Sequence, residues 1–240
     1  MGNLKKTINS GSNRVVRMTI SKMHGTAVKK ILLIGDSIRM GYCRFVRELM
    51  QGEAEVFYPE DNCRFAQYTL RGLQDWQAQL GLWNGVDLIH WNNGLWDAGH
   101  LGIGATAEAE ALTIDTGTGL QRYEKDPLTP PEIYAYFIHR IAIRMKTLFP
   151  AAGIIFADST PVVEEQCPEA LSRNNAEIRQ YNSLAREALR EIPGITFNDL
   201  HTFARNNAAH LHSDWVHFNE AGSRLLAAEV VRVIRERLAQ

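Results

Sequence analysis

Short apolar runs alternate along this chain with longer segments of helical periodicity, and this alternation is the strongest constraint on its fold. The apolar runs predict strands at Lys30–Ile34, Ala54–Tyr58, Asp87–Trp91, Gly153–Ala157 and Ile195–Asn198. The remaining periodic segments predict helices near 38–50, 69–80, 130–148, 173–191 and 219–238. Strand–helix alternation of this kind produces a parallel sheet with helices on both faces. We therefore predict an α/β fold, a three-layer α/β/α sandwich around about five parallel strands.

The segment that follows the first predicted strand carries the clearest chemical signal. Gly35 ends the apolar run, and Asp36-Ser37 then leads into a helix. Ser37 is thereby placed on a strand-to-helix turn, beside the free backbone N–H groups of a helix N-terminus. A serine nucleophile gains most there, because the same N–H groups can hold the oxyanion that it generates. The alternative is that Ser37 only caps the helix.

A second signal lies near the other end of the chain, where Asp214 and His217 stand three residues apart before the last predicted helix. A serine hydroxyl is a weak nucleophile until a base takes its proton, and that base needs a carboxylate to orient it. An imidazole and a carboxylate in one loop can supply both functions. A surface loop with an Asp and a His is the alternative.

Together, the early Gly-Asp-Ser and the late Asp-x-x-His resemble the SGNH/GDSL hydrolase family over residues 30 to 238. The resemblance implies a flavodoxin-like SGNH hydrolase fold, with Ser37 as nucleophile, His217 as base and Asp214 as the orienting acid. In open α/β sheets, ligands bind beyond the carboxyl ends of the strands, which is where these residues are expected.

The family's third block is usually Gly-x-Asn-Asp, whose Asn side chain donates to the oxyanion. Here the third predicted strand runs into Asn92-Asn93-Gly94-Leu95-Trp96-Asp97, and aligning Gly94 with Asp97 puts Trp96 where the family has Asn. The donor is then the amide of Asn92 or Asn93, or the indole N–H of Trp96. We favour an Asn, because a compact amide can reach a small oxyanion. Asn92-Asn93-Gly94 is also a strong turn signal.

The family's second block supplies a backbone N–H, normally from Gly. Some carbohydrate acetylesterases of the family have Asn, four residues, Gly, one residue and Ser at this block. On that register Asn62 matches the Asn, Gln67 stands at the Gly and Thr69 at the Ser. Gln67 has an N–H to give, but a non-Gly residue resists a positive φ. The oxyanion hole is thus where the chain departs from the family pattern.

Composition excludes several function classes. The 26 basic and 27 acidic residues give no electrostatic case for nucleic acid or an anionic membrane. No run approaches the roughly 18 apolar residues that a membrane span needs. The three cysteines lack the spacing of a disulfide framework or a zinc site. We therefore expect no metal and no cofactor, and a small-molecule ester as the binding partner.

We expect two parts in the chain, a basic extension over residues 1–29 and a single domain over residues 30–240. The extension has no apolar core of a secretory signal, so a disordered arm and a cytoplasmic protein are expected. The segment 98–126 is long for a connection and rich in Gly. It is either a substrate-shaping excursion, with a short hairpin about Asp115-Thr116-Gly117, or a surface insertion.

The resemblance to acetylesterases, with Trp91, Trp96 and Trp215 near the carboxyl edge of the sheet, favours a serine esterase acting on acetyl groups of carbohydrates. Two alternatives stay open. One is a lysophospholipase or thioesterase that acts on longer acyl chains. The other is a binding protein that keeps the fold with an impaired site, motivated by Gln67 and Trp96 at the family's Gly and Asn positions.

Overall fold

The computed structural model describes residues 28–100, 127–167 and 172–240. Five parallel strands form one sheet in the order β2-β1-β3-β4-β5. The strands are β1 (Lys29–Ile34), β2 (Ala54–Phe57), β3 (Leu88–Trp91), β4 (Gly153–Ala157) and β5 (Ile195–Asn198). The predicted three-layer α/β fold with a parallel sheet is confirmed.

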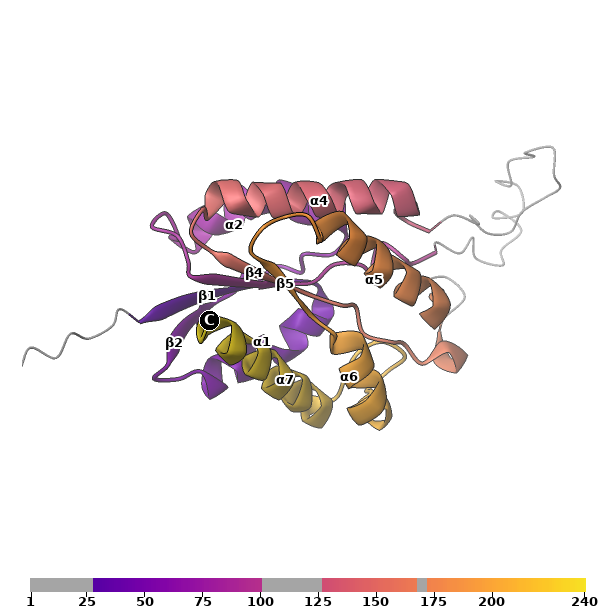
Figure 1. Ribbon diagram of the computed structural model, residues 1–240. Helices are drawn as coiled ribbons and strands as arrows, with labels where there is room; N and C mark the ends of the chain where they lie inside the picture. The colour runs from indigo at the N-terminus through magenta and orange to yellow at the C-terminus, as the bar shows by residue number, and fades with distance from the viewer. Residues whose placement is uncertain (1–27, 101–126, 168–171) are drawn as a thin grey trace, which may run out of the picture.

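Helices cover both faces of the sheet (Figure 1). One face carries α1 (Ser37–Leu49), α6 (Leu200–Asn207) and α7 (Glu220–Leu238). The other carries α2 (Ala66–Gln79), α4 (Pro131–Leu148) and α5 (Asn175–Leu189). Each layer of helices buries its own hydrophobic cluster against the sheet.

The side chains of β1 show why the strands are continuously apolar. Ile31 and Leu33 point into the core beneath α1 and α7, whereas Leu32 and Ile34 point into the core beneath α2 and α4. All four are at most 2% exposed. A parallel sheet covered on both faces has no polar side, so its central strands lose the alternating pattern.

One helix boundary differs from the sequence prediction, and three helices are additional. Helix α2 begins at Ala66, three residues before the predicted start, because the Asp97 carboxylate accepts a hydrogen bond from the Ala66 N–H. Helix α6 and two short 3-10 helices, η1 (Glu164–Gln166) and η3 (Ala209–Leu211), were not predicted. The cap of α6 is Asp199, whose side chain accepts from the Thr202 N–H at 3.0 Å.

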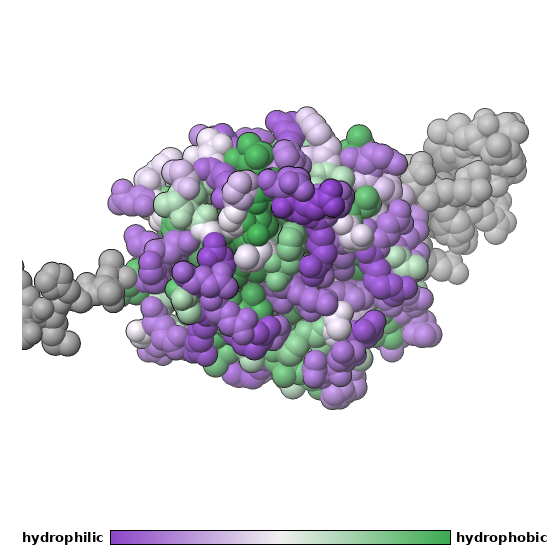
Figure 2. Space-filling model, viewed as in Figure 1, coloured by the Kyte–Doolittle hydropathy of each residue, from purple (hydrophilic) through white to green (hydrophobic). Residues whose placement is uncertain are grey.

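Three sequence expectations lie outside the described residues. These are the arm that makes up most of residues 1–29, most of the 98–126 excursion, and its hairpin about Asp115-Thr116-Gly117. On the visible face of the molecule, hydrophilic residues predominate and hydrophobic ones are scattered among them (Figure 2).

Candidate active site

Ser37 is the first residue of α1 and follows β1 at the carboxyl edge of the sheet. The residue that caps α1 is Asp36, whose Oδ1 accepts a hydrogen bond from the Ile38 N–H at 3.0 Å. Asp36, and not Ser37, therefore caps the helix. The Ser37 hydroxyl is left to make a different contact.

That contact is with the last loop of the chain. Ser37 Oγ lies 2.8 Å from Nε2 of His217, and Nδ1 of His217 lies 2.8 Å from Oδ2 of Asp214. Both are hydrogen-bond distances. With the Nδ1–H donating to Asp214, Nε2 is left as the acceptor for the serine proton. The structure thus brings together the three residues on which the sequence prediction centred.

The loop of Asp214 is folded around its carboxylate. Oδ1 accepts from the backbone N–H groups of Val216 and His217, at 2.8 and 2.7 Å, which leaves Oδ2 for the imidazole. Partial burial opposes ionisation, but these hydrogen bonds, with that from the imidazole, outweigh it and lower the pKa of Asp214. The Asp214 side chain is thus held as a carboxylate.

Close packing of α7 on α1 sets the distance between serine and histidine. A Cβ placed on Gly41 of α1 would lie 3.2 Å from Ser223 Oγ of α7. Helix α7 starts directly after the loop of His217, and its cap Asn219 accepts from the Gly222 N–H at 2.9 Å. A Cβ at Gly41 would thus press on the Ser223 side chain at the contact between α1 and α7.

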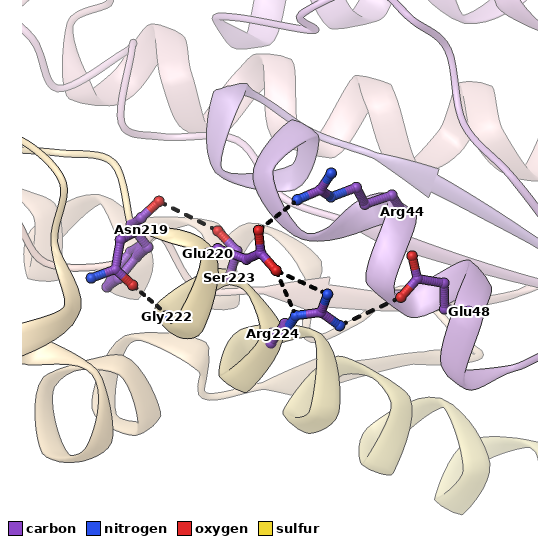
Figure 3. Close-up of polar contacts among 8 residues, drawn as sticks. Arg44, Glu48, Asn219, Glu220, Gly222, Ser223 and Arg224 are labelled. Carbon is purple, nitrogen blue, oxygen red and sulfur yellow. Dashed lines mark hydrogen bonds and ion pairs between the residues drawn. The ribbon is translucent and has the colours of Figure 1, made fainter.

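Charged residues line the same helix pair on its outer side (Figure 3). Glu220 of α7 pairs with Arg44 of α1 at 3.4 Å and with Arg224 of its own helix at 2.9 Å. Arg224 in turn reaches Glu48 of α1 at 3.5 Å. These side chains are more than half exposed, so each pair contributes little to stability, and the buried packing dominates.

A buried arginine fastens the loop after β2 to the turn that precedes Ser37. Arg39 is 1% exposed and donates to the carbonyls of Gly35, Pro59 and Asp61. The Cys63 N–H donates to the same Gly35 carbonyl at 3.2 Å. A guanidinium can hold several carbonyls at once because its N–H groups form a fixed fork. The second loop of the site is therefore fixed against the first.

Asn92 and Asn93 both follow β3, but their amides have different surroundings. The Asn93 amide accepts from the Trp91 indole at 2.6 Å and donates to the Arg64 carbonyl at 2.7 Å, so both its oxygen and its nitrogen have a partner. Asn92 lies under the nucleophile turn: a Cβ on Gly35 would be 2.0 Å from its Oδ1. That oxygen has no hydrogen-bond partner. Only glycine fits at position 35 while Asn92 stays there.

The loop before α2 contains the residues expected to supply the backbone donor. Asn62 Oδ1 accepts from the Arg64 N–H at 3.0 Å, and Arg64 has a φ of 47°. Gln67 lies in the first turn of α2 with an exposed side chain that faces α4. The conformation that favours glycine is thus at Arg64, and Gln67 adopts no positive φ.

The three tryptophans are not equivalent. Trp91 is 0% exposed and packs edge-on against Phe156, with ring centres 4.9 Å apart. It is a core residue, which corrects the expectation that it reaches the edge. Trp96 and Trp215 are both half-buried, so each retains surface that a ligand could touch.

Asp97 holds the loop after β3 against α2. Both carboxyl oxygens face the Ala66 N–H, at 3.0 and 3.2 Å. Burial raises the pKa of Asp97 to about 7, although hydrogen bonds from Ala66 and Thr129 oppose the shift. Asp97 is 0% exposed. Its ionisation is thus coupled to the folding of this edge of the site.

Several solved structures with this arrangement of elements carry the names of ester hydrolases. A lipase/acylhydrolase from Enterococcus faecalis matches with a TM-score of 0.60 at 18% identity, over 88% of this chain and 97% of that one. A GDSL-like lipase from Bacteroides thetaiotaomicron gives 0.57 at 15% identity, over 87% and 88%. The acetylxylan esterase Axe2 from Geobacillus stearothermophilus gives 0.55 at 19% identity, over 86% and 94%.

The chain has the GDSL-type hydrolase fold. The resemblance predicted from the two end blocks is confirmed at the level of fold. No protein-family model and no curated protein matches the sequence.

Sequence reasoning missed two residues at this edge of the sheet. Arg39 was not distinguished from an ordinary helix residue, and Arg173, whose side chain donates to the Leu95 carbonyl, was not considered. The signal for Arg39 is its position: it falls in the first turn of α1, among apolar residues that are buried.

Within residues 28–100, 127–167 and 172–240, no three His, Cys, Asp or Glu side chains gather as a metal site. Over the same residues no helix is both long enough and apolar enough to cross a bilayer.

The raised pKa of Asp97 predicts a specific pH dependence of stability. Between its unfolded value of 3.8 and its folded value of about 7, the folded chain keeps a proton that the unfolded chain has lost. Asp97 therefore stabilises the fold at low pH, and this contribution is lost as the pH rises through 7, by up to about 1.4 kcal/mol per pH unit. In Asp97→Asn, which cannot ionise, urea unfolding from pH 4 to 8 should show stability rising relative to wild type.

The matched control is Asp199→Asn. Hydrogen bonds from Thr202 outweigh partial burial and lower the pKa of Asp199, so its own contribution changes only at acid pH. A parallel response of the two variants between pH 4 and 8 would contradict the prediction for Asp97.

Proposed function

We propose that this protein is a serine ester hydrolase, with Ser37 as nucleophile, His217 as general base and acid, and Asp214 as the orienting carboxylate. The observation that carries the proposal is the pair of 2.8 Å contacts that links these three side chains across 180 residues of sequence. The names of the structural neighbours, a lipase and an acetylxylan esterase among them, support the same reaction class.

The reaction follows from the geometry. Ser37 Oγ attacks the ester carbonyl while Nε2 of His217 takes its proton, and the resulting imidazolium is stabilised by Asp214. The imidazolium then returns the proton to the departing alkoxide, which leaves an acyl group on Ser37. A water molecule, deprotonated by the same nitrogen, then attacks the acyl group, and the acid leaves as the imidazolium returns the proton to Ser37 Oγ. The mechanism requires only protein groups and water.

The oxyanion donors are the least conventional part of the proposal. The Ser37 N–H at the first position of α1 is one, and the positive end of that helix adds to its effect. Of the two asparagines we assign the role to Asn92, because its side chain lies beside Gly35 and Asp36, next to Ser37, whereas the Asn93 amide donates to Arg64. The Gln67 N–H, in the first turn of α2, is the proposed third donor.

The openness of the site favours a small acyl group on a large alcohol. The side chains of His217 and Asp214 are 43% and 46% exposed, so the reacting bond lies at a surface rather than at the end of a channel. Trp215, on the same loop, offers a half-buried ring against which a sugar can stack. We therefore propose acetyl esters of carbohydrates as substrates, with longer acyl esters as the alternative.

The first test is hydrolysis of 4-nitrophenyl acetate by wild type and Ser37→Ala. Without the hydroxyl no acyl-enzyme can form, so kcat/KM should fall by at least about 10³-fold. Equal rates would remove the assignment of Ser37. A parallel assay with the octanoyl ester addresses acyl length, and a preference for octanoyl would favour the long-chain alternative.

A fluorophosphonate probe separates catalysis from an impaired binding protein. An activated serine should be modified at Ser37 and nowhere else in a peptide map. Absence of labelling at pH 8, in protein shown by circular dichroism to be folded, would favour the binding protein.

The assignment of the asparagines gives a further prediction. Asn92→Ala should lower kcat by about 10²–10³, the usual effect of losing one oxyanion donor. Asn93→Ala should act mainly on stability, because it leaves the Trp91 indole and the Arg64 carbonyl without partners. The readouts are kcat and the urea midpoint of each variant.

Trp96→Phe is the matched control, since it removes the indole N–H and keeps an aromatic ring. A loss of kcat in Trp96→Phe, with Asn92→Ala unaffected, would transfer the donor role to the indole.

A further inference from the structure

Arg173 is a cation at the edge of the proposed active site that the mechanism above does not use. It stands two residues before α5, and its Nε donates to the Leu95 carbonyl in the loop after β3. Its guanidinium carbon lies 5.0 Å from the ring centre of Trp215. Trp215 is flanked by Asp214 and lies two residues before His217. Arg173 thus joins the loop after β3 to the loop of the proposed base.

The positive charge of Arg173 is only partly balanced by nearby acidic side chains. Among the described residues it forms no ion pair, and its hydrogen bond to a carbonyl uses one of its five N–H donors. Burial lowers its pKa, partly offset by the fields of Asp36 and Asp97. Burial raises the pKa of both of these acids, which weakens them as counter-charges. A half-buried guanidinium whose other N–H donors have no partner among the described residues is costly unless an anion completes it.

Arg173 lies on the side of the proposed site from which the alcohol part of the ester would leave. His217 must deliver a proton to the departing alcohol, so the alcohol leaves past the loop that contains His217 and Trp215. Arg173 stacks on that loop. An anionic group on the alcohol would therefore approach the free N–H donors of Arg173.

We propose that Arg173 binds a carboxylate carried by the alcohol part of the ester substrate. This inference rests on the proposed function and narrows the substrates to acyl esters of acidic alcohols, such as acetylated sugar acids. A planar guanidinium suits a carboxylate because it can donate two parallel hydrogen bonds. The competing explanation is that Arg173 only balances the charge of Asp36 and acts on no substrate.

The experiment compares two esters that differ in one charge, 3-acetoxybenzoate and its methyl ester. For each, kcat/KM is measured with wild type, Arg173→Gln, Arg173→Lys and the control Arg190→Gln, an exposed arginine at the end of α5. The quantity of interest is the ratio of kcat/KM for the anionic ester to that for the neutral ester. This ratio cancels any general loss of activity or folding.

Arg173→Gln should lower the ratio about 10- to 100-fold, the effect of losing a hydrogen-bonded charge pair, with most of the change in KM. Arg173→Lys should retain part of the ratio, and Arg190→Gln should leave it at the wild-type value. If Arg173→Gln slows both esters equally, Arg173 only balances charge and the proposal is overturned.

Binding of the product separates this inference from the proposed function. Calorimetry with Ser37→Ala should show 3-hydroxybenzoate binding more tightly than its methyl ester, and this difference should vanish in Ser37→Ala/Arg173→Gln. Hydrolysis of neither ester by wild type would overturn the proposed function alone. Equal binding of the two phenols would overturn the role of Arg173 alone.

Discussion

The packing of α7 on α1 is the constraint on which the rest of the proposed site depends. The first helix supplies Ser37 and the last helix follows His217, so the two side chains meet only because their helices lie side by side on one face of the sheet. Gly41 allows the close approach, and Ser223 fills it. The exposed ion pairs around Glu220 lie beside this contact and contribute little to its stability.

The remaining loops are held to that pair by buried polar side chains. Arg39 ties the loop after β2 to Gly35, and Asp97 ties the loop after β3 to the start of α2. Each spans segments far apart in sequence and has almost no exposed surface. A buried polar group is tolerated where its partners are complete, and complete partners fix a unique arrangement. Arg39 and Asp97 thus fix the positions of the loops at the carboxyl edge of the sheet.

The parts of this structure that depend on local patterns could be predicted from the sequence. Ile31 to Ile34 form a buried run that any covered parallel strand requires, and Asp214 and His217 are close enough in sequence to meet within one loop. The different surroundings of the Asn92 and Asn93 amides could not be predicted. Their amides are distinguished by Gly35 and Arg64, which only the tertiary structure brings to them. The burial of Trp91 could not be predicted either, because it depends on packing against Phe156, which is distant in the sequence.

The sequence separation of 180 between Ser37 and His217 also bears on the order of folding. Contacts between distant segments form late, because the entropy of closing a long loop is lost before the contact stabilises anything. The sheet can assemble from neighbouring strand–helix units, whereas the pairing of α1 with α7 closes the chain on itself. The side chains of Ser37 and His217 therefore meet only when the first and last helices of the chain have docked, and a chain without that contact contains every residue of the proposed site without bringing them together.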